Sequence, residues 1–308
     1  MREIQAAKRR VTLFTMIITH DEATDAFIDA LCAAAERGVE VRVSGDIYTF
    51  GVMVAETDGG WLSNAGIKAT KQMRRRLVAS GVKFKWIGEL GPLLYARRTH
   101  LKWCIVDDTV FSFGGVNLYD NGINHVDFMV SMKDKALADK LEAEHQRIHE
   151  SERTGRRYHS HSFDCTVGTV LVDGGMFGGS AIYRRACELT EQASRVVLVS
   201  QYQPSGKLAT LLHQTKSKLY FNQWQKASGA NKFLLRTSAT FKRQRNSYRR
   251  KGYLHAKFML FYMPDGSTVA LTGSHNFVHG GVLLGTREIA LETRDPQLVR
   301  QIEAYFTK

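Results

Sequence analysis

The sequence predicts an α/β protein built from two tandem domains with largely parallel or mixed sheets. Segments with helical periodicity alternate with short apolar or alternating segments along the chain. The order of these segments in the first half repeats in the second half. The 308 residues, 44% of them hydrophobic, are enough for two domains with separate cores.

The first domain is expected at residues 1–150. Gly38 is well placed to end a helix, and the alternating residues after it indicate a strand. The expected helices are 4–9, 23–36, 68–80 and 136–150, and the expected strands are 11–18, 39–43, 82–86, a hairpin beginning at His100, and 126–132.

A polar, basic linker is expected at residues 151–161, and the second domain at 162–308. The expected helices are 182–191 and 207–215, and the expected strands are 167–172, 196–200, 218–221, 232–236 and a hairpin beginning at His255. The strand at 167–172 has no counterpart ahead of Ile4, so the first repeat looks shortened at its N-terminus.

A His-x-Lys motif occurs once in each half, as His100-Leu-Lys102 and as His255-Ala-Lys257. Each copy opens an apolar hairpin that ends in a glycine turn and an asparagine. Residues two apart on a strand point to the same face, so each histidine projects with its lysine. Two such pairs face to face would surround a phosphodiester with imidazoles and ammonium groups. This chemistry requires neither a metal nor a cofactor.

The second hairpin is four residues longer and contains the turn signal Pro264-Asp265-Gly266. Two additional residues in each arm would leave every side chain on its original face. We therefore expect the longer hairpin to keep the motif geometry.

The charge of the chain favours polyanionic partners. The net charge is +13, with basic clusters just ahead of both motifs. The sequence contains neither an apolar run of bilayer-spanning length nor a secretory signal pattern at Met1. The four cysteines are far apart, as in reduced cytoplasmic proteins. A cytoplasmic protein, peripheral to the inner face of the membrane, is expected.

The repeated pattern HxKx4Dx6G[GS]xN resembles the paired HKD motifs of the phospholipase D superfamily. The second copy has Tyr262 where the first has Asp107, a position that is mainly structural in the family. The resemblance implies two tandem phospholipase D-like α-β-α sandwich domains with mixed sheets, related by a pseudo-twofold axis, with the active site at their interface. Both motifs lie in one chain, so a monomer is expected.

The resemblance also implies how the motif residues act. His100 is expected to attack phosphorus and form a phosphohistidine, and His255 to act as general acid and base. The groups expected to hold the non-bridging oxygens are Lys102, Lys257, Asn117 and Asn276.

Four further residues complete the implied site. Asp127 and Glu288, on the strand after each hairpin, match acidic positions of the family and would orient the imidazoles. Ser274 is a candidate phosphate ligand, and Gly115 replaces it in the first copy.

The stretch 272–277, followed by Arg287-Glu288, is similar to the cardiolipin synthase-like phosphatidyltransferases. This implies a phosphatidyltransferase or phospholipase D-type enzyme acting on anionic phospholipid at a membrane surface. The expected lipid contacts are the segment 277–285 and the loop 47–61, which contains Tyr48, Phe50 and Met53.

A nuclease or phosphodiesterase acting on nucleic acid is the alternative. The segment 242–251 contains Tyr248 amid six basic residues, a mixture of charge and stacking that suits a nucleic-acid backbone. A third alternative is a binding domain without activity, which the retained site residues disfavour.

Overall fold

The computed structural model describes residues 1–56, 64–88, 98–223 and 245–307. The chain divides into two compact units. Unit 1 comprises Met1–Ser112, Val116–Asn124 and Met129–Tyr158, and unit 2 comprises Phe113–Gly115, His125–Phe128 and His159–Lys308. Two short segments of the first half of the sequence therefore belong to unit 2.

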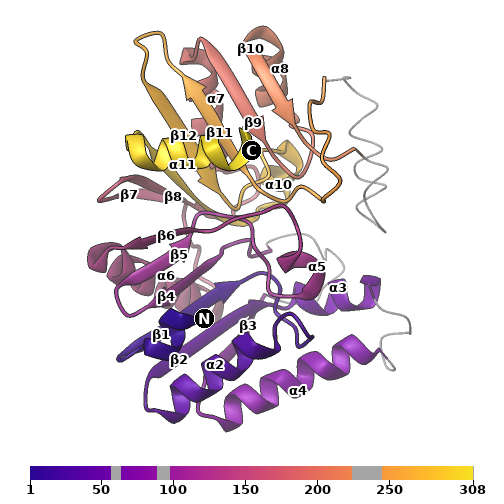
Figure 1. Cartoon of the computed structure of the whole chain (residues 1–308), viewed down its shortest axis with the longest axis vertical. Helices are drawn as coiled ribbons and strands as arrows, with labels where there is room; N and C mark the ends of the chain where they lie inside the picture. The colour runs from indigo at the N-terminus through magenta and orange to yellow at the C-terminus, as the bar shows by residue number, and fades with distance from the viewer. Residues whose placement is uncertain (57–63, 89–97, 224–244, 308) are drawn as a thin grey trace. The chain divides into compact units, whose positions relative to one another are not determined.

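Unit 1 is a six-stranded mixed sheet with the order β3-β2-β1-β4-β5-β6 (Figure 1). The strands β1, β2 and β3 are parallel, and the others pair antiparallel. Its strands are β1 (Arg10–Thr15), β2 (Glu40–Asp46), β3 (Lys83–Ile87), β4 (Trp103–Val106), β5 (Thr109–Ser112) and β6 (Val130–Lys133). Its helices are α1 (Arg2–Ala6), α2 (Asp25–Glu36), α3 (Tyr48–Glu56), α4 (Ala65–Ala79), α5 (Asp120–Ile123) and α6 (Lys135–Thr154).

Helices cover both faces of this sheet. The alternating residues of β1 and β2 put Leu13 and Val43 against Leu31 of α2 and Leu77 of α4. On the opposite face, α6 packs over β1, where His145 contacts Phe14. The sequence predicted the end of α2 well, since Gly38 follows this helix with a φ of +86°.

Unit 2 is a seven-stranded mixed sheet with the order β10-β9-β11-β12-β13-β8-β7. Its strands are β7 (His161–Cys165), β8 (Gly168–Gly174), β9 (Arg195–Val199), β10 (Lys216–Tyr220), β11 (Phe258–Tyr262), β12 (Thr268–Gly273) and β13 (Arg287–Thr293). Its helices are α7 (Ala181–Gln192), α8 (Lys207–Gln214), α10 (His279–Leu284) and α11 (Pro296–Thr307).

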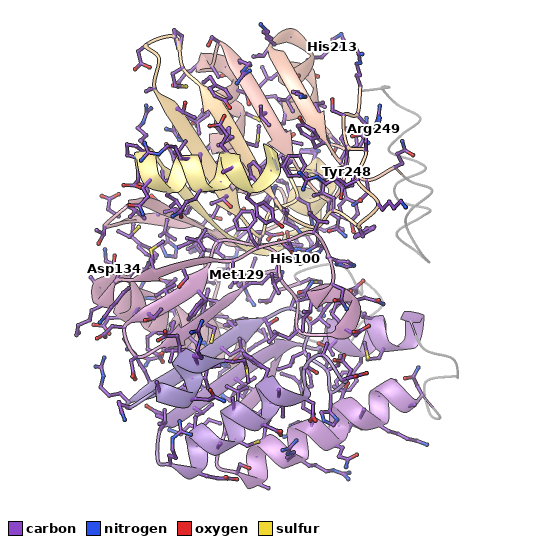
Figure 2. The ribbon with its side chains drawn as sticks, viewed as in Figure 1. His100, Met129, Asp134, His213, Tyr248 and Arg249 are labelled. Carbon is purple, nitrogen blue, oxygen red and sulfur yellow. The ribbon has the colours of Figure 1, made fainter. Side chains whose placement is uncertain are left out.

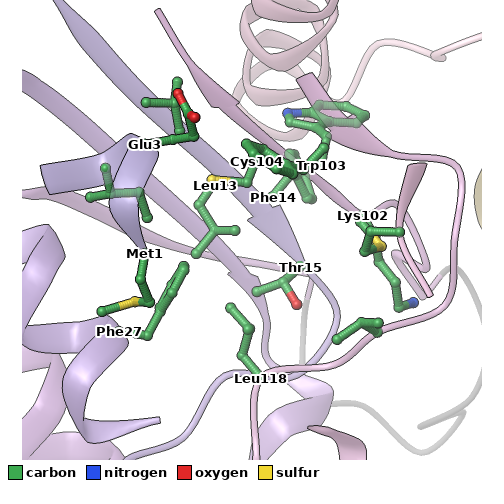
Figure 3. A pocket seen from close by; sticks show the side chains of 15 residues that line it. Met1, Glu3, Leu13, Phe14, Thr15, Phe27, Lys102, Trp103, Cys104 and Leu118 are labelled. Carbon is green, nitrogen blue, oxygen red and sulfur yellow. The ribbon is translucent and has the colours of Figure 1, made fainter. Parts of the chain in front are cut away.

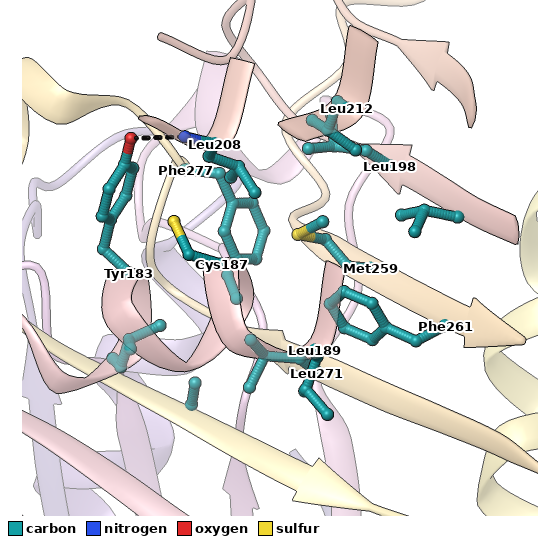
Figure 4. Packing of buried hydrophobic residues seen from close by; sticks show 14 of the residues in the cluster. Tyr183, Cys187, Leu189, Leu198, Leu208, Leu212, Met259, Phe261, Leu271 and Phe277 are labelled. Atoms are coloured by element: carbon teal, nitrogen blue, oxygen red, sulfur yellow. Dashed lines mark hydrogen bonds between the residues drawn. The ribbon is translucent and has the colours of Figure 1, made fainter. Parts of the chain in front are cut away.

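The core of unit 2 lies between α7, α8 and one face of the sheet (Figure 4). Leu189 and Leu208 from the helices meet Met259 and Leu271 from the strands. On the other face, Phe306 of α11 packs on Phe258. Both units are thus α-β-α sandwiches with mixed sheets, which confirms the predicted fold class.

The strand registers define equivalent positions in the two units. Arg10 of β1 pairs with Glu40 of β2, as Arg195 of β9 pairs with Lys216 of β10. Hence β1, β2, β4, β5 and β6 correspond to β9, β10, β11, β12 and β13. Within the described residues, β3 has no counterpart in unit 2, and β7 and β8 have no counterpart in unit 1. The predicted strand 167–172 is β8.

The two hairpins differ in another way than predicted. Val106 pairs with Thr109 around a two-residue turn, whereas Tyr262 pairs with Thr268 around Pro264–Gly266. The second turn therefore adds an odd number of residues, and not two in each arm, which by itself would move the following side chains to the opposite face. Phe113, at a φ of +55°, is an additional residue after β5 in the first hairpin. It brings the residues of the two glycine turns back to equivalent faces.

Several other expectations need correction. The segment 47–61 is a helix, α3, up to Glu56, and Phe50 and Met53 are buried in a small core cluster, so they are not lipid contacts. The helix expected at 136–150 continues to Thr154, and part of the expected linker precedes β7. The expected strand 232–236 and Trp61 lie outside the described residues. Among the helices that the structure describes, none combines the length and apolarity needed to cross a bilayer.

Candidate active site

Each motif lies in extended chain just before its strand, and not on the strand as predicted. His100 and Lys102 precede β4, which begins at Trp103, and Lys257 immediately precedes β11. The two-residue alternation nevertheless holds in this extended stretch. Lys102 Nζ donates to the carbonyl oxygen of His100 at 2.9 Å, and Lys257 Nζ donates to that of His255. Both motifs therefore fold their lysine back along their histidine.

The lysines are almost fully buried. Lys102 is 2% exposed and Lys257 is 1% exposed. A buried ammonium group is costly unless anions or dipoles compensate it. These sites are thus prepared for negative charge.

His255 is hydrogen-bonded to Asp127, a residue of the first half of the sequence that belongs to unit 2. His255 Nδ1 lies 2.6 Å from Asp127 Oδ2 and 3.0 Å from Lys257 Nζ. An ammonium group has only donors, whereas a carboxylate accepts. The proton of Nδ1 is therefore donated to Asp127, and Nε2 carries the lone pair.

Burial, more than the neighbouring charges, keeps the imidazole neutral at pH 7. Burial, followed by the charge of Lys257, lowers the pKa of His255 to about 3. Burial alone would raise the pKa of Asp127, but the hydrogen bond from His255 and the charge of Lys257 bring it below its ordinary value. A neutral imidazole with a fixed tautomer is the form that accepts a proton or attacks an electrophile.

Asp127 is held from several sides. Its carboxylate accepts from the N–H groups of Gly115 and Phe128, and its carbonyl oxygen accepts from the Tyr305 hydroxyl. A β-carbon at Gly115 would lie 2.6 Å from Asp127 Oδ2 and 2.7 Å from Lys257 Nζ. No side chain fits at position 115, which explains why the first motif has glycine where the second has serine.

The prediction that Asp127 lies on the strand after its hairpin is wrong, because β6 begins only at Val130. It lies in an extended segment that Val126 joins to Leu254 by a β-bridge. Glu288 does lie on its predicted strand, β13, and is 3% exposed.

Ser274 is fully buried, and its hydroxyl donates to the Glu288 carboxylate. Its role as a phosphate ligand stays a prediction. Glu288 pairs in register with Asp173 of the neighbouring strand β8. Burial raises the pKa of Asp173 to about 7, although Ser180 and the N–H groups of Ala181 and Ile182 donate to its carboxylate.

The motif asparagines share one feature. Asn117 in unit 1 and Asn276 in unit 2 are buried, and within the described part of the chain the side-chain oxygen of each lacks a hydrogen-bond partner. The two ends of a carboxamide are nearly isosteric, so rotation places an N–H donor at the same position. Each asparagine can thus offer a donor to an oxyanion.

Sequence reasoning missed the residues that anchor the chain ahead of each motif. Asp46, at the end of β2, accepts from the N–H of Thr99 and from the guanidinium of Arg98. At the equivalent end of β10, Asn222 accepts from the N–H of Leu254 and donates to its carbonyl oxygen. The only available signal was a polar residue at or just beyond the end of each strand.

His125 is a second residue that sequence reasoning missed. Its ring centroid lies 5.3 Å from that of His255 and 4.8 Å from that of Tyr253. Burial, followed by the charge of Lys257, lowers the pKa of His125 to about 4. It therefore adds a second neutral imidazole beside His255, two residues ahead of Asp127.

An apolar pocket in unit 1 includes the motif lysine in its lining (Figure 3). Its volume is about 670 Å³. The side chains around Lys102 are mostly apolar, among them Leu13, Phe27, Cys104 and Leu118.

Two expected contact surfaces are only partly accessible. Tyr248, labelled in Figure 2, is 4% exposed and donates its hydroxyl to the carbonyl oxygen of Gly252, so it is not a stacking platform for bases. Residues 242–244 of the same basic cluster lie outside the described residues. In the segment 277–285, Phe277 and Val282 are in the core, while Leu283 is 55% exposed.

A family model described as "Cardiolipin synthase, PLD-like domain" matches residues 1–149 and 179–308. Curated protein sequences provide no match to this chain.

Solved structures with a similar fold include several enzymes of known name. Phosphatidylserine synthase of Haemophilus influenzae Rd KW20 aligns with a TM-score of 0.67 and 16% identity, over 99% of this chain and 81% of that chain. Polyphosphate kinase of Porphyromonas gingivalis aligns with a TM-score of 0.63 and 13% identity over 98% of this chain, which spans only 44% of that protein. A mutant of yeast tyrosyl-DNA phosphodiesterase gives 0.51 and 13%, over 95% of this chain and 85% of that one. At these identities the likeness establishes the fold alone.

Proposed function

Because the chain belongs to the family of the cardiolipin synthase, phospholipase D-like domain, we propose that it is a metal-independent phosphatidyltransferase or phospholipase D-type enzyme. It cleaves phospholipid phosphodiesters through a phosphohistidine. The observation that carries the proposal is the buried His255, with Asp127 on Nδ1 and Lys257 beside it.

In the first step, a ring nitrogen of His100 bonds to phosphorus while the bond from phosphorus to the leaving alcohol breaks. His255 Nε2 gives its proton to the leaving oxygen. In the second step, the acceptor hydroxyl loses its proton to His255, its oxygen bonds to phosphorus, and the phosphorus–nitrogen bond breaks. The acceptor is a lipid alcohol or water.

Before it can act as the acid, His255 must gain a proton. Its pKa of about 3 belongs to a site without bound anion. A phosphodiester anion at Nε2 raises that pKa, because it stabilises the imidazolium. Lys102, Lys257, Asn117 and Asn276 are proposed to hold the non-bridging oxygens, and Glu288 to orient His100.

Lipid is favoured over nucleic acid by two observations. The pocket beside Lys102 suits an acyl chain, because apolar side chains make up most of its lining. The buried Tyr248 removes the aromatic contact on which the nuclease alternative depended. We propose a membrane-peripheral monomer acting on anionic phospholipid.

The test incubates the full chain with phosphatidylglycerol vesicles and, separately, with single- and double-stranded DNA and RNA, all with a chelator. Lipid turnover that His100→Ala and His255→Ala each abolish supports the proposal. His213→Ala, which removes an exposed histidine on α8, is the matched control and should keep full activity. Motif-dependent nucleolysis without lipid turnover would reverse the choice of substrate.

A further inference from the structure

Three polar side chains meet in unit 1, on the sheet face that α6 covers. Ser44 Oγ lies 2.8 Å from His149 Nε2 and 3.2 Å from His145 Nε2, and the two Nε2 atoms are 3.1 Å apart. Ser44 and His145 are 1% and 3% exposed. None of the three belongs to a motif or has a part in the chemistry proposed above.

The same place in unit 2 is filled by aromatic rings. By the strand registers, Ser44 corresponds to Tyr220. The helices α6 and α11 begin after Asp134 and Asp295, each of which accepts from the N–H three residues later, so His145 corresponds to Phe306. Tyr220 and Phe306 pack at 4.6 Å between ring centroids. The fold therefore accepts an apolar filling here, and unit 1 carries hydroxyl and imidazole groups instead.

These polar groups line an open pocket of about 1210 Å³. Lys83 and Lys85 of β3, Arg42 of β2 and Arg153 of α6 also line it. Glu40 and Glu142 hold Arg42, and Glu40 also holds Lys83. Within the described part of the chain, Lys85 and Arg153 form no salt bridge. Besides Glu142, the acidic residues of α6 near the pocket are Glu150, in the lining, and Glu152.

The charges around the pocket favour an anion over a cation as its ligand. Burial, followed by His149, Arg42 and Lys85, lowers the pKa of His145 to about 3. Burial, followed by Lys85, lowers the pKa of His149 to about 4, with Glu152 opposing and Arg42 adding to the effect. Two imidazoles four residues apart on a helix match a metal chelate in geometry. The surrounding positive potential repels a metal ion and attracts an anion.

We propose that this pocket binds a singly protonated phosphate group, as in a phosphate monoester, through Ser44, His149, Lys85 and Arg153. A phosphate that keeps one proton both accepts and donates hydrogen bonds, as a hydroxyl and two neutral imidazoles can use, whereas sulfate only accepts. Burial and, after it, the surrounding positive charge keep the imidazoles neutral. The bound anion offsets that charge, so binding takes up protons. The aromatic rings of Phe14 and Trp103 beneath His145 add no charge.

The test titrates inorganic phosphate into the full chain carrying His100→Ala and His255→Ala, which separates this pocket from the proposed catalytic chemistry. Calorimetry in buffers of different ionisation enthalpy should show saturable binding with proton uptake, stronger at pH 6 than at pH 8. His149→Ala in the same background should weaken binding at least tenfold. Lys218→Ala, at the position in unit 2 equivalent to Arg42, should leave it unchanged.

A second readout is imidazole NMR, in which the signals of His145 and His149 should shift on adding phosphate. If His149→Ala does not fold, Lys85→Glu on the exposed edge serves in its place. Glycerol phosphate and phosphatidic acid vesicles distinguish a soluble phosphate from a lipid headgroup. Zinc binding at this pocket, equal binding of sulfate, or no binding of any phosphate would each overturn the proposal.

Discussion

The two units anchor their motifs at the same backbone positions but with different side chains. Ahead of the motif, unit 1 uses the buried pair of Asp46 and Arg98, and unit 2 uses the neutral Asn222. After the motif, Asp107 accepts from the N–H groups of residues 8–10, whereas at the equivalent position Tyr262 donates to Glu303. The two units therefore share the backbone path around the motif, and different side chains hold that path in each unit.

The largest expected effect tests the contact between the two halves of the sequence, Asp127 with His255. Asp127→Asn should lower turnover by about 10²- to 10⁴-fold, because the amide no longer fixes the tautomer and charge of the imidazole. Lipid turnover measured across pH checks this. Asp139→Asn, at a half-exposed carboxylate of α6, should have no effect. Full activity of Asp127→Asn would show that the contact is structural.

Next in size is the comparison of the two anchors. Asp46→Ala should lower the free energy of unfolding by about 3–5 kcal/mol, because the buried Arg98 loses its carboxylate. Asn222→Ala should cost about 2 kcal/mol, since it removes two neutral hydrogen bonds. Chemical denaturation measures both. Equal losses would contradict the distinction between a charged and a neutral anchor.

The pH dependence of stability separates buried acids from buried imidazoles. Asp173 has its pKa raised from 3.8 to about 7, so the folded state binds its proton more tightly than the unfolded state. Its contribution is complete below 3.8 and is lost as the pH rises to about 7, a change of a few kcal/mol.

The imidazoles of His145 and His149 act in the opposite direction. Their lowered pKa values make the protein less stable as the pH falls below 6.5. Asp173→Asn should therefore steepen the rise of stability between pH 4 and 7, measured by denaturation at several pH values. An unchanged slope would show that Asp173 has an ordinary pKa.

The smallest expected effect concerns the position at which the second motif departs from the family pattern. Asp107→Ala should cost about 1–2 kcal/mol, because three backbone N–H groups, two of them open to solvent, lose their acceptor. Tyr262→Phe removes one hydrogen bond to Glu303 and should cost about 1 kcal/mol. Thermal unfolding checks both variants. A loss of turnover in Tyr262→Phe without unfolding would assign the tyrosine more than a structural role.

The sequence predicted the fold class and most strands, because hydrophobic periodicity and glycine at helix ends are local signals. It also indicated Asp127 and Glu288 through their place after the hairpins. It could not indicate that Asp127 meets His255, since that contact joins residues more than a hundred positions apart. The polar pocket at Ser44 was equally hidden, because a lone serine on an alternating strand has no distinguishing pattern.

The burial of Tyr248 and Phe50 illustrates a second limit of prediction from sequence. An aromatic residue in a basic or loop-like stretch has the same composition whether it faces solvent or the core. Tyr248 is enclosed because residues far along the chain, such as Phe306, pack beside it. Only tertiary structure decides that outcome.

The central claim is a covalent phosphohistidine formed by the paired motifs. The most direct measurement quenches wild-type protein in alkali during turnover of phosphatidylglycerol and maps the modified peptide by mass spectrometry. A phosphatidyl or phosphate adduct on His100 that is stable to alkali, labile to acid and absent in His100→Ala is the predicted result. Continued turnover in His100→Ala, or turnover without any adduct on either motif histidine, would contradict it.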